Sequence, residues 1–136
     1  MRTIKLMTTT LFFLFGVLEI NAQNNLENET IENEFENEKV YDVADKMPEF
    51  PGGTIDLFEY IKEKTEEEGV AGTGRVIVTF IVEPNGSITH AKVSLSRGID
   101  LDEAALRIVE SMPKWTPGEM SGKTVRVKYT LPITFR

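Results

Sequence analysis

Two runs of alternating residues, 75–83 (RVIVTFIVE) and 87–96 (SITHAKVSLS), flank Asn85 and Gly86, and they restrict the fold more than any other part of the chain. Asn-Gly between such runs is the strongest short-range signal of a β-hairpin with a two-residue turn. With that turn one face of the hairpin is mostly apolar, and a slip of one residue would set polar side chains against the core. The expected pairs are Val82–Thr89, Phe80–Ala91, Val78–Val93 and Val76–Leu95 on the apolar face, and Ile81–His90, Thr79–Lys92 and Ile77–Ser94 on the other.

A third strand is predicted within residues 124–136, TVRVKYTLPITFR, where apolar and polar residues alternate again. Pro132 cannot donate to a sheet ladder, so this strand is expected at an edge of the sheet. The run 75–83 is apolar on both faces through Ile77 and Ile81, which is typical of a central strand. We therefore expect the third strand to pair with 75–83 on one side and to leave its other side free.

Two amphipathic helices complete the predicted fold. The first runs from about residue 55 to residue 66, is capped by Thr54 and stops near Gly69. The second begins at Asp100, which forms a capping-box pattern with Glu103, and ends before Pro113. The order helix, strand, strand, helix, strand predicts an α+β domain, with two helices packed on one face of a three-stranded antiparallel sheet. The expected apolar positions are Ile55, Leu57, Phe58 and Ile61 in the first helix and Leu101, Ala105, Ile108 and Met112 in the second.

The first 22 residues have the pattern of an export signal. Arg2 and Lys5 precede an apolar run at residues 6–18, and Ala22 closes a cleavage site. The run is shorter than the roughly 20 residues that span a bilayer. We expect cleavage after Ala22 and an exported protein; the alternative is a retained single N-terminal membrane anchor. Residues 23–46 are predicted to be an acidic Asn/Glu-rich linker and lead-in, and residues 47–136 the domain.

The residue inventory offers little for catalysis. There is no cysteine, which excludes disulfides and thiolate metal sites. The single histidine, His90, is expected on the solvent face of its strand, and the acidic residues of 100–103 are better explained by helix capping than by metal binding. The glycines of 69–74 follow a helix and precede a strand, the reverse of a phosphate loop. We expect no enzyme, no cofactor and no metal, and Trp115 is predicted to anchor a turn to the core.

Positive charge gathers where the free edge is predicted. Residues 112–136 carry five cations and only Glu119 as an anion, whereas the whole chain has a net charge of −7. The negative total argues against nucleic-acid binding. Charged edge residues can simply discourage aggregation, or the edge can accept a partner strand by β-augmentation. The cations are Lys114, Lys123, Arg126, Lys128 and Arg136, and we place Arg126 and Lys128 on the polar face of the last strand.

Three linked segments resemble the C-terminal domain of TonB proteins: GRVIVTFIVEPNGSITHAKV, LDEAALRIVESMPKWTPG and VRVKYTLPITF. The lead-in MPEFPGG resembles the form found in Bacteroidetes, and the resemblance covers about residues 47–136. It implies a periplasmic domain that binds the TonB box of outer-membrane receptors, which joins the sheet beside the last strand. Carried over by position, the partner-binding residues are Thr124, Val125, Arg126, Val127, Lys128, Tyr129, Thr130 and Leu131.

The resemblance implies a role in energy-coupled transport, together with an inner-membrane proton-driven complex if the chain is anchored. Two features depart from the family pattern. A Tyr-Pro pair common before the first strand is replaced by KTEEEGVAGTG, and residues 23–46, which lack proline, would span only about 80 Å when fully extended. The alternative hypothesis is a structural module that forms a homodimer through the same edge, with Ile77 and Ile81 buried. We predict that a bound strand pairs along residues 124–131 and that its backbone pairing ends at Pro132.

Overall fold

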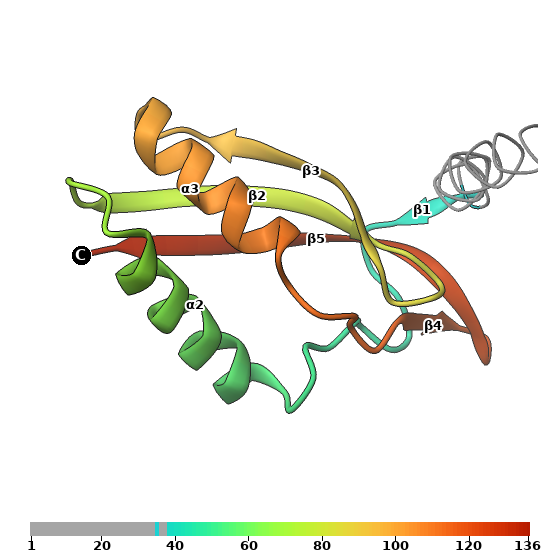
Figure 1. Cartoon of the computed structure of the whole chain (residues 1–136). Coiled ribbons are helices and arrows are strands. Elements are labelled where there is room, and N and C mark those ends of the chain that lie inside the picture. Colours follow the sequence, from blue (N-terminus) through green and yellow to red (C-terminus); the bar gives the residue numbers. More distant parts are fainter. Residues whose placement is uncertain (1–34, 36–37) are drawn as a thin grey trace, which may run out of the picture. The chain divides into compact units, whose positions relative to one another are not determined.

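A computed structural model describes residue 35 and residues 38–136 (Figure 1). The predicted signal at 1–22 and most of the predicted linker lie outside these residues. Residues Glu38–Arg136 form one unit. Its elements are β1 (Val40–Tyr41), α2 (Thr54–Glu68), β2 (Gly74–Val82), β3 (Ile88–Leu95), α3 (Ile99–Glu110), β4 (Gly118–Met120) and β5 (Lys123–Phe135).

The sheet has β2 at its centre, as predicted. β2 is antiparallel to β3 on one side and to β5 on the other, and its ladder with β5 runs without interruption from Gly74↔Phe135 to Val82↔Val127. The prediction of only three antiparallel strands is wrong, because the strand order is β1-β5-β2-β3, with β4 also paired to β5. β1 is parallel to β5, and both extra strands are too short to give a periodic sequence signal.

The tip of the β2–β3 hairpin differs from the predicted two-residue turn. The Gly86 amide donates to the Glu83 carbonyl, and the Glu83 amide donates to the Ser87 carbonyl. The loop therefore contains three residues, Pro84 to Gly86, and Gly86 has a φ of +85°. A β-turn followed by a left-handed residue is the common three-residue hairpin loop, and proline is favoured at the second position of such a turn.

The longer loop shifts the register near the hairpin tip. Val82 pairs with Ile88 rather than Thr89, and an irregularity follows at His90, whose φ is +54°. A bulge adds one residue to its strand, so the predicted pairs Val78–Val93 and Thr79–Lys92 are found beyond it. A second irregularity then pairs Ile77 with Leu95, and the other expected pairs are displaced.

The two helices are present, but their N-terminal caps were predicted wrongly. Gly53 and Gly98, rather than Thr54 and Asp100, hold the N-cap positions, and neither helix has a side-chain cap. The Asp102 carboxylate instead accepts hydrogen bonds from the Arg97 amide and the Ser96 hydroxyl. The predicted stop at Gly69 is confirmed, since this residue is left-handed.

One apolar core joins both helices to the same face of the sheet, on which Val76, Val78 and Phe80 lie (Figure 1). The prediction for Trp115 is confirmed, because the residue is buried and its ring packs against three aromatic rings at centroid distances of 4.9 to 5.8 Å. A salt bridge between Arg107 of α3 and Glu68 of α2, with an N···O distance of 2.9 Å, ties the helices together and lowers the pKa of the Glu68 carboxyl. The three rings around Trp115 belong to Phe50, Phe80 and Tyr129.

The helices did not bury every predicted apolar position. Leu57 and Ile61 of α2 are buried, whereas Ile55 and Phe58 are 73% and 58% exposed. The hydrophobic stripe of α2 is therefore wider than the part of the helix that the sheet covers.

Candidate functional site at the edge of β5

β5 follows the predicted alternation along most of its length. Its inward side chains, Val127, Leu131, Ile133 and Phe135, are buried, and Tyr129 stacks on Phe80 at a centroid distance of 5.6 Å. The outward residues from 128 to 134 are exposed. One face of this strand therefore holds the core together while the other meets solvent.

The ladder partners of β5 change along its length. Residues 123–125 pair with β4, Arg126 and Val127 pair with β1, and Val127 also pairs with β2. From residue 128 to residue 135, β2 is the only strand partner among the described residues. The predicted binding range 124–131 is thus divided: its last four residues lie on a stretch with one open side, and β1 already lies beside Arg126 and Val127.

Pro132 indicates which backbone groups face the open side. It lies opposite Ile77 in the uninterrupted β2–β5 ladder, and a proline is accommodated in such a ladder when its nitrogen faces away from the neighbouring strand. Backbone groups of alternate residues point to the same side of a strand. By this argument Lys128 and Thr130 offer N–H donors to the open side, and the next position in the series, residue 132, has none.

Arg126 was predicted on the polar, solvent-facing side of the last strand, but it is buried, so that part of the prediction is wrong. Its side chain is 5% exposed, and its guanidinium makes a bidentate pair with Glu83, with Nε–Oε2 and Nη2–Oε1 distances of 2.9 and 3.0 Å. The hydroxyl of Thr89 also donates to Glu83, and Arg126 Nη1 donates to the Glu38 carbonyl. The Arg126 side chain therefore joins β5 to the end of β2 and to the lead-in.

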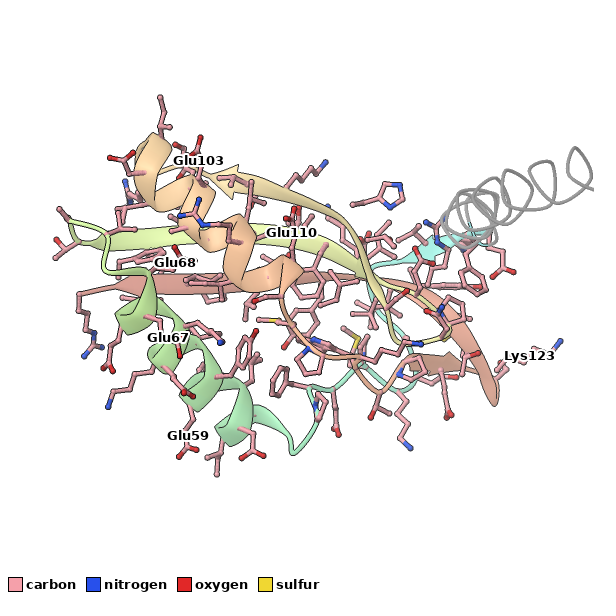
Figure 2. All side chains as sticks on the ribbon, viewed as in Figure 1. Glu59, Glu67, Glu68, Glu103, Glu110 and Lys123 are labelled. Atoms are coloured by element: carbon pink, nitrogen blue, oxygen red, sulfur yellow. The ribbon has the colours of Figure 1, made fainter. Side chains whose placement is uncertain are left out.

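The two helices and β5 carry net charges of opposite sign. Helices α2 and α3 together carry ten carboxylates and three cations, whereas β5 carries three cations and no carboxylate. Figure 2 labels five of the helical glutamates, which lie along α2 and α3, and Lys123 at the start of β5. An acidic segment would therefore be repelled by most of the helical surface and attracted to the strand.

The other residues considered from the sequence do not assemble into a reactive centre. His90 is exposed, with Nδ1 3.0 Å from the hydroxyl oxygen of its neighbour Thr89. Within residues 38–136, no group of three or more His, Asp or Glu residues is arranged to hold a metal ion. In this same part of the chain, no helix is long and apolar enough to cross a membrane.

The two helices on one face of the sheet, with a basic strand that is open on one side from residue 128 onward, define a small α+β domain. Residues 68–136 match the family model of the Gram-negative bacterial TonB protein C-terminal domain, which is just over half of the chain, and the protein belongs to this family. TonB-like domains are periplasmic, non-enzymatic interaction domains that contact outer-membrane receptors. Neither a curated protein nor a solved structure matches the chain significantly.

Proposed function

We propose that this protein is a periplasmic TonB-like module that binds the TonB box of outer-membrane receptors by β-augmentation along β5, in support of energy-coupled transport. The observation that carries the proposal is the open side of β5 from residue 128 onward, in a domain of the TonB C-terminal family. An incoming strand satisfies the unpaired backbone groups of such an edge and places alternate side chains on its two faces.

The short length of the open edge limits what backbone pairing alone can contribute. Only four residues of the open edge, Lys128 to Leu131, come before Pro132. A hydrogen bond contributes about 1 kcal/mol net. β1 pairs with Arg126 and Val127 in the direction parallel to β5. A parallel partner strand that displaced β1 would extend its pairing to Arg126 and Val127, and so along residues 126–131.

Thr130→Pro is expected to weaken binding of a receptor peptide that contains the TonB box by about tenfold or more, since it removes a donor in the middle of the edge and disturbs strand geometry. Thr130 is exposed, so the fold should tolerate the change better than it would at an inward position. Fluorescence anisotropy with a labelled peptide measures the affinity, and circular dichroism checks the fold.

Thr134→Pro is the matched control, because Thr134 is also exposed and outward but lies beyond Pro132. Its affinity for a peptide that pairs only with residues 124–131 and ends before residue 132 should stay within about twofold of the wild-type value, a difference of about 0.4 kcal/mol. Equal affinity for all three proteins would show that the peptide does not use this edge.

A chain with Val40→Pro and Tyr41→Pro is expected to bind the same peptide several-fold more tightly. The two prolines remove the backbone donors of β1, so the peptide no longer competes with β1 for Arg126 and Val127. Val43→Pro serves as the control, since Val43 is 74% exposed and lies outside β1. Unchanged affinity in the double variant would mean that the bound strand stops short of Val127.

The alternative function, a homodimer formed through the same edge, draws on one observation. Ile77 and Ile81 are only half-buried on the face of the sheet opposite the core, and they lie one strand away from the open edge. Sedimentation over a concentration series separates the two functions, because a stable dimer would leave no edge for a receptor.

A further inference from the structure

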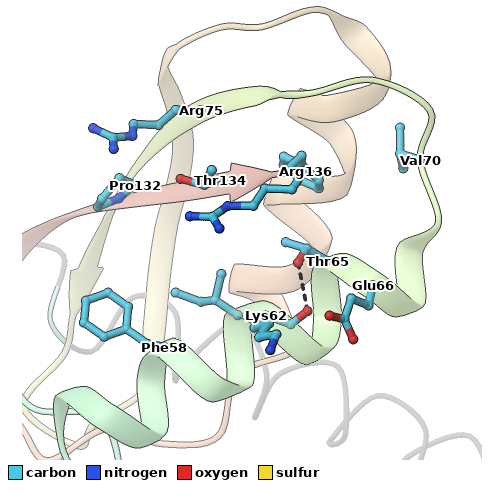
Figure 3. Close-up of a pocket in the computed structure, with 11 residues that line it drawn as sticks. Phe58, Lys62, Thr65, Glu66, Val70, Arg75, Pro132, Thr134 and Arg136 are labelled. Carbon is cyan, nitrogen blue, oxygen red and sulfur yellow. Dashed lines mark hydrogen bonds between the residues drawn. The ribbon is translucent and has the colours of Figure 1, made fainter.

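A groove lies between α2 and the last part of β5 (Figure 3). Its volume is about 660 Å³, and it is open to solvent. Pro132, Thr134 and Phe135 of β5 form one wall, and Phe58 and Lys62 of α2 stand opposite. Because the open side of β5 borders the groove, a chain that leaves this edge at Pro132 can enter it directly.

Part of the apolar lining of the groove is not used by the core. Phe58 is 58% exposed, whereas Leu57 and Ile61 of the same helix are buried. An exposed aromatic side chain on the wall of a groove offers a partner apolar area to bury, at about 25 cal/mol per Å². The groove therefore has a place for one large apolar side chain beside Phe58.

The charged lining favours an anion. Among the residues that line the groove, three are cations and Glu66 is the single anion. None of these cations, Lys62, Arg75 and Arg136, forms a salt bridge within residues 38–136. In Figure 3 the Arg75 and Arg136 side chains lie on opposite sides of the β5 ribbon, close to Pro132 and Thr134. These cations are unusual in a domain whose helices are strongly acidic, and they select against a basic occupant.

We infer that this groove binds the residues of the receptor segment that directly follow the strand paired with β5, and that these residues combine an apolar side chain with one or more carboxylates. The inference rests on the proposed function. A partner strand that runs parallel to β5, as β1 does, loses its backbone partner at Pro132 and continues toward Phe58, Arg75 and Arg136. Pairing along the edge supplies the register, and the groove supplies side-chain selectivity.

The test uses random dodecapeptides displayed on phage and selected on the full chain. Peptides whose binding is lost with Thr130→Pro are bound at the edge, and only these are scored. They should show an alternating segment followed on its C-terminal side by an apolar residue and by Asp or Glu. For the best of them, a chain with Arg75→Gln and Arg136→Gln should bind about 3- to 10-fold more weakly, as expected for two solvent-exposed ion pairs, and added salt should weaken the wild-type complex more than the variant complex.

Matched variants separate the groove from general surface effects. Phe58→Ala should weaken the same peptide by about fivefold through lost apolar contact, whereas Ile99→Ala, at an even more exposed apolar residue of α3, should not. Arg97→Gln is the control for charge. Edge-bound peptides without acidic enrichment, or with full affinity for the double Gln variant, would overturn the inference and leave the proposed function intact. Recovered peptides that also bind Thr130→Pro, or a failure to recover any, would contradict the proposed function itself.

Discussion

Arg126→Ala is expected to lower the free energy of unfolding by about 3–5 kcal/mol, the usual cost of removing one partner of a buried ion pair. The side chains of Arg126 and Glu83 are only 5% and 3% exposed. Without the guanidinium, the Glu83 carboxylate stays buried with the Thr89 hydroxyl as its remaining side-chain donor. Urea unfolding followed by the fluorescence of the chain's one tryptophan, Trp115, measures the loss.

Two further variants decide whether the cost comes from an unpaired charge. Lys128→Ala removes a cation two residues along the same strand, but Lys128 is exposed, so the expected change is within about 0.5 kcal/mol. Replacing both members of the pair, with Arg126→Met and Glu83→Leu, should restore much of the lost stability, because no buried charge remains. If Arg126→Ala alone cost less than about 1 kcal/mol, the pair would be solvated in solution and its contribution to the fold would be small.

This pair illustrates a signal that was present in the sequence but was missed. Once β5 is aligned with β2 so that Val127 lies opposite Val82, the next position brings Arg126 toward Glu83. The alternation of β5 alone predicted that Arg126 faces solvent. A cross-strand register, rather than the pattern of one strand, was needed to find its partner.

The helices, the three long strands and the central position of β2 followed from periodicity, because each has enough residues to show a period. β1 and β4 have two and three residues, which is too few for such a pattern. The bulge at His90 was also beyond prediction, since no glycine marks the position where φ becomes positive. β1 matters most for function, because it occupies part of the edge that the alternation alone had indicated as free.

The groove between α2 and β5 could not be found from the sequence for a related reason. Ile55 and Phe58 fit the apolar stripe of an amphipathic helix, so they were expected in the core. In the structure, α2 buries only Leu57 and Ile61, and Ile55 and Phe58 remain exposed. Whether an apolar helical residue packs inward or lines a surface groove depends on how far the sheet extends beneath the helix.

Gly86→Ala is expected to destabilise the domain by about 2–5 kcal/mol, with two separate causes. Gly86 has a φ of +85°, where a side chain costs about 1–2 kcal/mol. A Cβ atom at this position would also lie 2.2 Å from the carbonyl oxygen of Trp115, and forcing the chain apart in a packed region adds about 1–3 kcal/mol. The clash lies against backbone, so no side-chain rotation relieves it.

Gly122→Ala separates the two causes, because Gly122 has a similar φ of +78° and an added Cβ would meet nothing within 4 Å. This control should therefore lose only the conformational part, about 1–2 kcal/mol. The excess loss in Gly86→Ala reports the contact between the hairpin tip and residue 115, where the Trp115 amide donates to the Gly86 carbonyl at 2.9 Å. Equal losses in the two variants, measured by urea unfolding, would mean that the hairpin tip moves away from Trp115 at little cost. In that case the buried Trp115 ring, and not this backbone contact, would hold the turn on the core.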